Sequence, residues 1–148
     1  MAETLFPVFE VPEITVPTQG VNRPYQPSVY FDYDKGDFRL DGSHKMTVST
    51  GYETYMQWCR KVVCTERDRC LAYSTDIGIE GESALAQQTH EAVESALERT
   101  ITEALMVNVH TEYVRNFEFE WSADALNVSF TVKGKQWQET TLETSYTT

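Results

Sequence analysis

All five prolines of this chain lie within its first 27 residues, and the rest of the 148-residue chain contains none. Proline fixes φ and removes a backbone donor, so residues 1–27 can form neither a regular helix nor a central strand. The same segment nevertheless carries a series of large apolar side chains, which includes Phe6, Phe9, Val11, Ile14 and Val16. Disordered tails are usually poor in such residues. We therefore expect an extended arm that lies along a neighbouring subunit, with a disordered tail as the alternative.

The charge balance bears on the class of partner. The chain carries 23 acidic and 12 basic residues, a formal net charge of −11. Such a surface repels nucleic-acid phosphates and anionic membranes, so we expect neither as a partner. No stretch reaches the length of a membrane span, and the N-terminus does not resemble a signal peptide. We expect assembly in the cytoplasm.

The residues that could carry chemistry do not form a recognisable pattern. Cys59, Cys64 and Cys70 match no zinc spacing, and we interpret them as structural thiols in a reducing compartment. A glycosidase-like carboxylate pair, such as Glu66 with Asp76 or Glu80, can always be drawn among so many acids. We therefore expect no enzymatic activity, no metal site and no cofactor.

Residues 28–135 have the patterns of one α+β domain. Residues 28–40 alternate in polarity around a turn at 34–36, and a short extended piece follows near residues 46–48. Thr50 and Glu53 match a capping box, which predicts a helix to about Cys64 that buries Tyr52, Tyr55, Met56, Cys59 and Val63. A loop over residues 65–81 precedes a helical stretch at 83–106 that could break at 87–89.

The second half of this domain predicts a hairpin. Phe117, Phe119 and Trp121 share one face before the turn at 122–125, and a second apolar series follows it. That series consists of Leu126, Val128, Phe130 and Val132. The fold class we predict is a small, mostly antiparallel sheet with two main helices packed on one face.

Residues 136–148 form a threonine-rich C-terminal segment with strong strand propensity. It lacks the usual edge-protecting residues, lysine and proline. Two interpretations stay open: a frayed end or final edge strand of the same sheet, and a strand offered to another subunit by β-augmentation. In the second, Trp137, Leu142 and Tyr146 are interface side chains. The loop at 65–69 is also open, because Glu66 and Arg67 could pair across an interface or clamp the loop internally.

Several short motifs, in order and spacing, resemble a family of contractile-tail phage baseplate proteins related to the T-even sheath initiator. They are Thr50-Gly51-Tyr52-Glu53, Gln57-Trp58-Cys59, Thr65-Glu66-Arg67, Tyr73-Ser74, Ile77-Gly78, Ala92-Val93-Glu94-Ser95, Thr102-Glu103-Ala104-Leu105-Met106-Val107 and Asn116-Phe117-Glu118-Phe119-Glu120-Trp121. The resemblance covers roughly residues 28–134. It implies a small α+β domain between the baseplate wedge and the sheath, in multiple copies around the tail tube.

The resemblance also implies partners. They are the tail sheath protein, which extends the initiator's sheet by strand exchange, and the wedge proteins, with the tube or hub as a further candidate for the arm. The family's acidic-proline-arginine motif is replaced here by Asn108-Val109-His110. Because histidine lacks the permanent charge and fork of arginine, the wedge contact at Asn108 and His110 would differ.

Together these observations predict a structural sheath-initiator protein of the virion baseplate, in a phage tail or a tail-like particle. The wider family has carried a lysozyme-like label, so a cell-wall hydrolase is the alternative. A soluble adaptor elsewhere in the tail is a third candidate.

Overall fold

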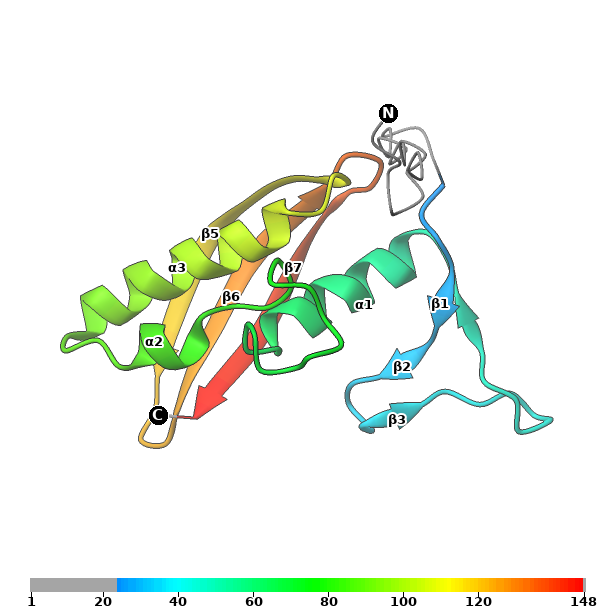
Figure 1. Cartoon of the computed structure of the whole chain (residues 1–148), viewed down its shortest axis with the longest axis horizontal. Coiled ribbons are helices and arrows are strands. Elements are labelled where there is room, and N and C mark those ends of the chain that lie inside the picture. The colour runs from blue at the N-terminus through cyan, green and yellow to red at the C-terminus, as the bar shows by residue number, and fades with distance from the viewer. Residues whose placement is uncertain (1–23, 148) are drawn as a thin grey trace, which may run out of the picture.

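The computed structural model describes residues 24–147 (Figure 1). Two-residue strands come first: β1 (Ser28–Val29), β2 (Phe31–Asp32), β3 (Asp37–Phe38) and β4 (Val48–Ser49). Helices α1 (Tyr52–Val63), α2 (Gly81–Leu85) and α3 (His90–Met106) follow, and then strands β5 (Thr111–Trp121), β6 (Ala125–Gly134) and β7 (Glu139–Thr147). The predicted α+β class is confirmed.

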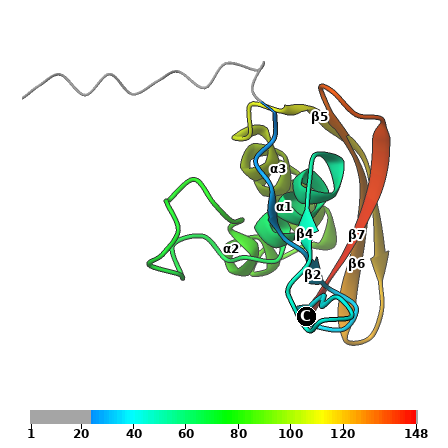
Figure 2. The same ribbon diagram turned by 90° about the vertical axis from the view of Figure 1, so that its right-hand side faces the viewer.

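The long strands form one antiparallel sheet in the order β5-β6-β7. Figure 2 shows this sheet edge-on, with α1, α2 and α3 on the same side of it. Leu126, Val128, Phe130 and Val132 of β6 are all buried and point to one face, as the alternation predicts. The predicted hairpin is therefore confirmed, and the sheet has one apolar and one polar face.

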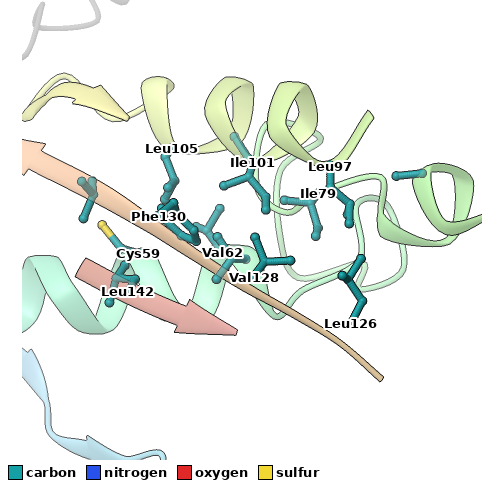
Figure 3. Close-up of a cluster of buried hydrophobic side chains, with 14 of the residues drawn as sticks. Cys59, Val62, Ile79, Leu97, Ile101, Leu105, Leu126, Val128, Phe130 and Leu142 are labelled. Carbon is teal, nitrogen blue, oxygen red and sulfur yellow. The ribbon is translucent and has the colours of Figure 1, made fainter. Parts of the chain in front are cut away.

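The core lies between that apolar face and the helices (Figure 3). On α3, Leu97, Ile101 and Leu105 lie on one stripe and are fully buried against β6. Helix α1 adds the buried side chains of Cys59 and Val62 to the same core. Full burial of a large apolar side chain stabilises a fold by about 1.5–3 kcal/mol, so these contacts fix the helices on the sheet.

The predicted capping box at the start of α1 is wrong. Gly51 is the N-cap, with φ 53° and ψ −119°, and no side chain caps this end. Positive φ favours glycine, so the entry turn is set by Gly51 rather than by a hydroxyl at Thr50. Tyr52, predicted to be buried, is 38 % exposed, and Met56 is only partly buried.

The predicted break in the second helical stretch is confirmed. Helix α2 ends at Leu85, and Thr89 caps α3 by accepting a hydrogen bond from the Ala92 amide at 3.2 Å. This satisfies one of the free N–H groups of the first turn of α3.

Residues 28–49 form a narrow antiparallel structure that we call the N-terminal ribbon. Strand β1 pairs with β4 and β2 pairs with β3, and Figure 1 shows the ribbon beside α1, at one end of the molecule. It is held by Gln57, whose side chain accepts from the Phe31 amide at 2.8 Å and whose carbonyl accepts from Tyr33 Oη at 3.0 Å. The predicted turn is present, yet Met46 and Val48 of the ribbon are 57 % and 64 % exposed.

Candidate protein interface

Strand β7 is one edge of the three-stranded sheet, and it is regular. Its nine residues pair with β6 without a register shift. The opposite edge strand, β5, has two register shifts and a positive φ of 56° at Asn116. Bulges and twists of that kind protect an edge from pairing with another chain. The edge of β7 has no such device, and it contains neither lysine nor proline.

The C-terminal segment is therefore the final edge strand of the chain's own sheet, the first of the two interpretations. Leu142 is 2 % exposed within the core, and Tyr146 Oη donates to the Val63 carbonyl at 3.1 Å. Trp137 stacks on Tyr55 with ring centroids 4.8 Å apart. These predicted interface side chains pack inside the fold, which leaves the backbone edge of β7 as the part that faces outward.

Grooves border this edge near both ends of β7. One is lined by the ribbon, α1 and the β7 residues Thr140 and Leu142. The other is lined by the end of α1, the start of α2 and the β7 residues 145–147. The surface is thus hollowed beside both ends of β7.

The polar face of the sheet carries a charged cluster at one end. Tyr113 Oη donates to the Glu139 carboxylate, which also accepts from Arg115 Nη2 at 2.6 Å, and Lys133 pairs with Glu112. The hydrogen bond from Tyr113 and the nearby Arg115 charge lower the pKa of Glu139. Because this cluster joins β5, β6 and β7 on the uncovered face, it is a candidate polar contact for a partner.

Asn108 and His110 gather around Tyr25. Asn108 Nδ2 donates to Tyr25 Oη at 3.1 Å, and Asn108 Oδ1 accepts from the His110 amide at 3.0 Å. The His110 ring lies edge-on to Tyr25 at 5.1 Å, and Trp137 lies on another side of Tyr25 at 5.7 Å. The structure therefore brings Asn108, His110 and Trp137 together, and His110 Nδ1 is buried without a partner among residues 24–147.

The loop after α1 is clamped internally. Arg67 donates to the Gly78 carbonyl and pairs with Glu80 at 3.1 Å, and the Arg67 amide bonds to the Ile79 carbonyl at 2.8 Å. Both oxygens of the Glu66 carboxylate accept hydrogen bonds from the first amides of α2. These contacts fit the internal-clamp interpretation of the loop.

A further groove, which we call the aromatic groove, lies between the N-terminal ribbon, its entry segment and α1. It is lined by Tyr25, Gln26, Pro27, Ser28, Val29, Phe31, Tyr33, Phe38, Thr54, Gln57, Trp58, Lys61 and Tyr73. Sequence reasoning did not single it out, because the alternating residues 28–40 indicated a strand rather than an exposed wall. The clustering of Tyr and Phe after the last proline is the signal that could have found it.

The remaining expectations concern the arm, metal binding and membrane spans. Phe6, Phe9, Val11, Ile14 and Val16 of the arm lie outside the described residues. Within residues 24–147, no cluster of His, Cys, Asp or Glu is arranged to hold a metal ion. None of the described helices combines the length and apolarity that crossing a membrane requires.

Comparison with known protein families gives a match over most of the chain. The family model described as "Contractile injection system sheath initiator" matches residues 28–137. The chain belongs to this family. The predicted resemblance is therefore confirmed, and the match includes the domain and the start of the C-terminal segment. A search of curated proteins found no match.

Membership assigns the chain a sheath-initiator role in a contractile injection system. Such a role implies contact with sheath and baseplate components. The matched region ends before β7 begins, whereas the sheet that β7 completes lies largely within it.

Proposed function

We propose that this protein joins the baseplate of a contractile tail or tail-like particle to its sheath, and that a sheath subunit adds a strand to the free edge of β7. The observation that carries the proposal is a regular, unprotected sheet edge in a member of the sheath-initiator family. Unpaired backbone N–H and C=O groups along an edge bind an extended segment of another chain, and side-chain pockets set its register.

Three further features support an edge-on partner. The grooves next to Thr140 and Tyr146 leave room beside β7 near both ends. Outward-facing Thr141, Glu143 and Ser145 are exposed, so the strand is available from its polar face as well. The buried face of β7 is anchored in the core, which would give the added strand a rigid template rather than a mobile tail.

A second part of the proposal concerns the contact with the baseplate wedge. We propose that the Asn108–His110 segment and the arm face wedge or tube components, and that several copies surround the tube axis. Val107 and Val109 are 49 % and 43 % exposed beside Asn108, which provides apolar surface for such a contact. Asn108 and His110, which lack the permanent charge and fork of arginine, would replace a charged contact by hydrogen bonding.

The proposed role is structural, without catalysis. Two of the three carboxylates considered for a hydrolase have partners in the fold, Glu66 in the amides of α2 and Glu80 in Arg67. Purified protein is expected to release no cell-wall fragments.

The experiment for the edge proposal uses paired lysine substitutions, because deletion of β7 would also remove Leu142 from the core. Thr141→Lys with Ser145→Lys places lysines on the edge strand, where they oppose strand addition. Their cross-strand partners on β6 are Thr131 and Asn127. Thr131→Lys with Asn127→Lys is the matched control, since it adds the same charge to the same face one strand further in.

Electron microscopy of particles assembled with each variant gives the readout. We expect the β7 pair to yield baseplates without extended sheath and the β6 pair to yield normal tails. Normal sheaths with the β7 pair would exclude the edge as the docking site. Equal loss of sheath with both pairs would indicate docking on the sheet face instead.

A further inference from the structure

We propose that, in the free subunit, the aromatic groove binds residues 5–17 of the same chain's arm. The inference concerns the isolated protein, so it stands or falls independently of the sheath-binding proposal. The arm would leave the groove when it engages a component of the tail.

The groove has an aromatic lining of the kind that binds proline-containing segments. Tyr33 and Phe38 come from the ribbon, Trp58 from α1, and Tyr73 from the following loop. Aromatic-lined grooves bind extended polyproline-type segments, because these have little conformational entropy left to lose. Phe38 and Tyr73 are 44 % and 38 % exposed, so the groove presents apolar surface in the described part of the chain.

Residues 5–17 have the matching composition. Prolines recur at positions 7, 12 and 17, separated by apolar residues and by Glu10 and Glu13. Proline favours an extended backbone at itself and at the preceding residue. Such a segment presents apolar side chains and backbone carbonyls to a surface that it contacts.

The charges are complementary. No lysine or arginine precedes Arg23, so every charged side chain in residues 1–22 is negative. Lys61 lines the groove with its ammonium 4.9 Å from the centre of the Tyr73 ring, and it has no carboxylate partner among residues 24–147. In a chain of net charge −11, an unpaired cation over an aromatic ring is a distinctive site for a glutamate-bearing segment.

The connection permits docking within one chain. The described chain begins at Pro24, and Tyr25 and Pro27, which follow it closely, line the groove. The six residues 18–23 can span up to about 20 Å, and they include Gly20 and Asn22, which favour chain reversal. A short tether gives an effective concentration on the order of millimolar, which favours the chain's own arm over that of another copy.

The test keeps the full chain and uses a labelled peptide of residues 3–18 as the probe. In an arm-serine chain, Phe6, Phe9, Val11 and Ile14 are all changed to serine, so its own arm no longer competes for the groove. We expect the peptide to bind this chain with one-to-one stoichiometry in fluorescence anisotropy. The wild-type chain should bind it about tenfold more weakly, because the tethered arm occupies the groove. Equal binding to both chains, or binding to neither, would overturn the proposal.

Matched charge reversals locate the binding site. Lys61→Glu in the arm-serine chain should weaken peptide binding by about threefold or more. Arg99→Glu makes the same change on an exposed position of α3 that lines none of the grooves described above, and it should leave binding unchanged. Equal effects of the two reversals would show that the peptide binds elsewhere. Sedimentation of the wild-type chain as an oligomer that the peptide dissociates would replace docking within one chain by docking between copies.

Discussion

The Glu66 carboxylate accepts a hydrogen bond from the Gly81 amide at 3.0 Å, so a side chain from the loop after α1 caps the first turn of α2. The second amide of that turn, from Glu82, lies 3.3 Å from the same carboxylate. A negative charge at a helix N-terminus satisfies free N–H groups and interacts favourably with the helix dipole. An acid that could be taken for a catalytic group is therefore part of the scaffold.

This relationship predicts a loss of stability rather than of activity. Glu66→Ala should lower the free energy of unfolding by about 1–2 kcal/mol, because two amides of α2 lose their acceptor. Urea denaturation followed by circular dichroism measures the change. Glu98→Ala, at an exposed position of α3, is the matched control and should shift the free energy by less than about 0.5 kcal/mol. Equal losses in the two variants would contradict the capping role.

The last residue of β6, Gly134, gives a second prediction. A Cβ added at Gly134 would lie 2.5 Å from Trp137 Cε3 and 3.2 Å from Tyr55 Cε1. Gly134→Ala should therefore displace the Trp137 ring from Tyr55 and lower stability by about 1–3 kcal/mol. Gly42→Ala is the control, since a Cβ there meets nothing within 4 Å. Near-ultraviolet circular dichroism and thermal unfolding of both variants would check it, and an unchanged Gly134→Ala spectrum would be the adverse result.

The buried faces of the helices and of the hairpin could be predicted from the sequence, because their apolar residues are covered by other parts of the same chain. Leu97 and Ile101 on α3, and Val128 and Phe130 on β6, repeat at the periods of helix and strand, and the burial they imply is satisfied within the chain. The family was also recognisable from short motifs in order.

The misjudged features depend on geometry that periodicity does not report. At the start of α1, Gly51 adopts a positive φ, and this overrides the Thr50 capping pattern. In the ribbon, alternation indicates strands, but it does not reveal whether an apolar side chain such as Val48 is covered. The roles of Glu66 and Arg67 follow from contacts more than ten residues away, with Gly81 and Gly78, which no local pattern encodes.

Thiol chemistry provides a third prediction. Cys59 is fully buried, whereas Cys64 and Cys70 are exposed, and all three are free. A thiol-specific chromogenic reagent at pH 8 should therefore label two cysteines rapidly and the third only as the protein unfolds. In Cys59→Ala, the slow labelling phase should disappear, while the rapid labelling of the other two cysteines should remain. Rapid labelling of three thiols in the native protein would show that the α1 core opens readily.

The last prediction concerns alkaline pH. Burial raises the pKa of the Cys59 thiol from 9.0 to about 12, and burial also raises the pKa of Tyr55, its neighbour in the core. A group whose pKa is higher in the folded state binds its proton more tightly there. The unfolded state therefore loses protons first as the pH rises above about 9, and stability must fall between about pH 9 and 12.

The Cys59 contribution can be isolated by substitution. One thiol lowers stability by at most about 1.4 kcal/mol per pH unit, so Cys59→Ala should flatten the decline above pH 9 by up to that slope. At pH 7 the same variant should lose about 1 kcal/mol for the missing sulfur in the core. Urea denaturation at intervals from pH 7.5 to about 10.5, with reductant present, measures both effects. Cys64→Ala, which removes an exposed thiol from the end of the same helix, should leave the slope as in the wild type. Identical slopes for Cys59→Ala and the wild type would mean that the buried thiol does not govern the alkaline decline.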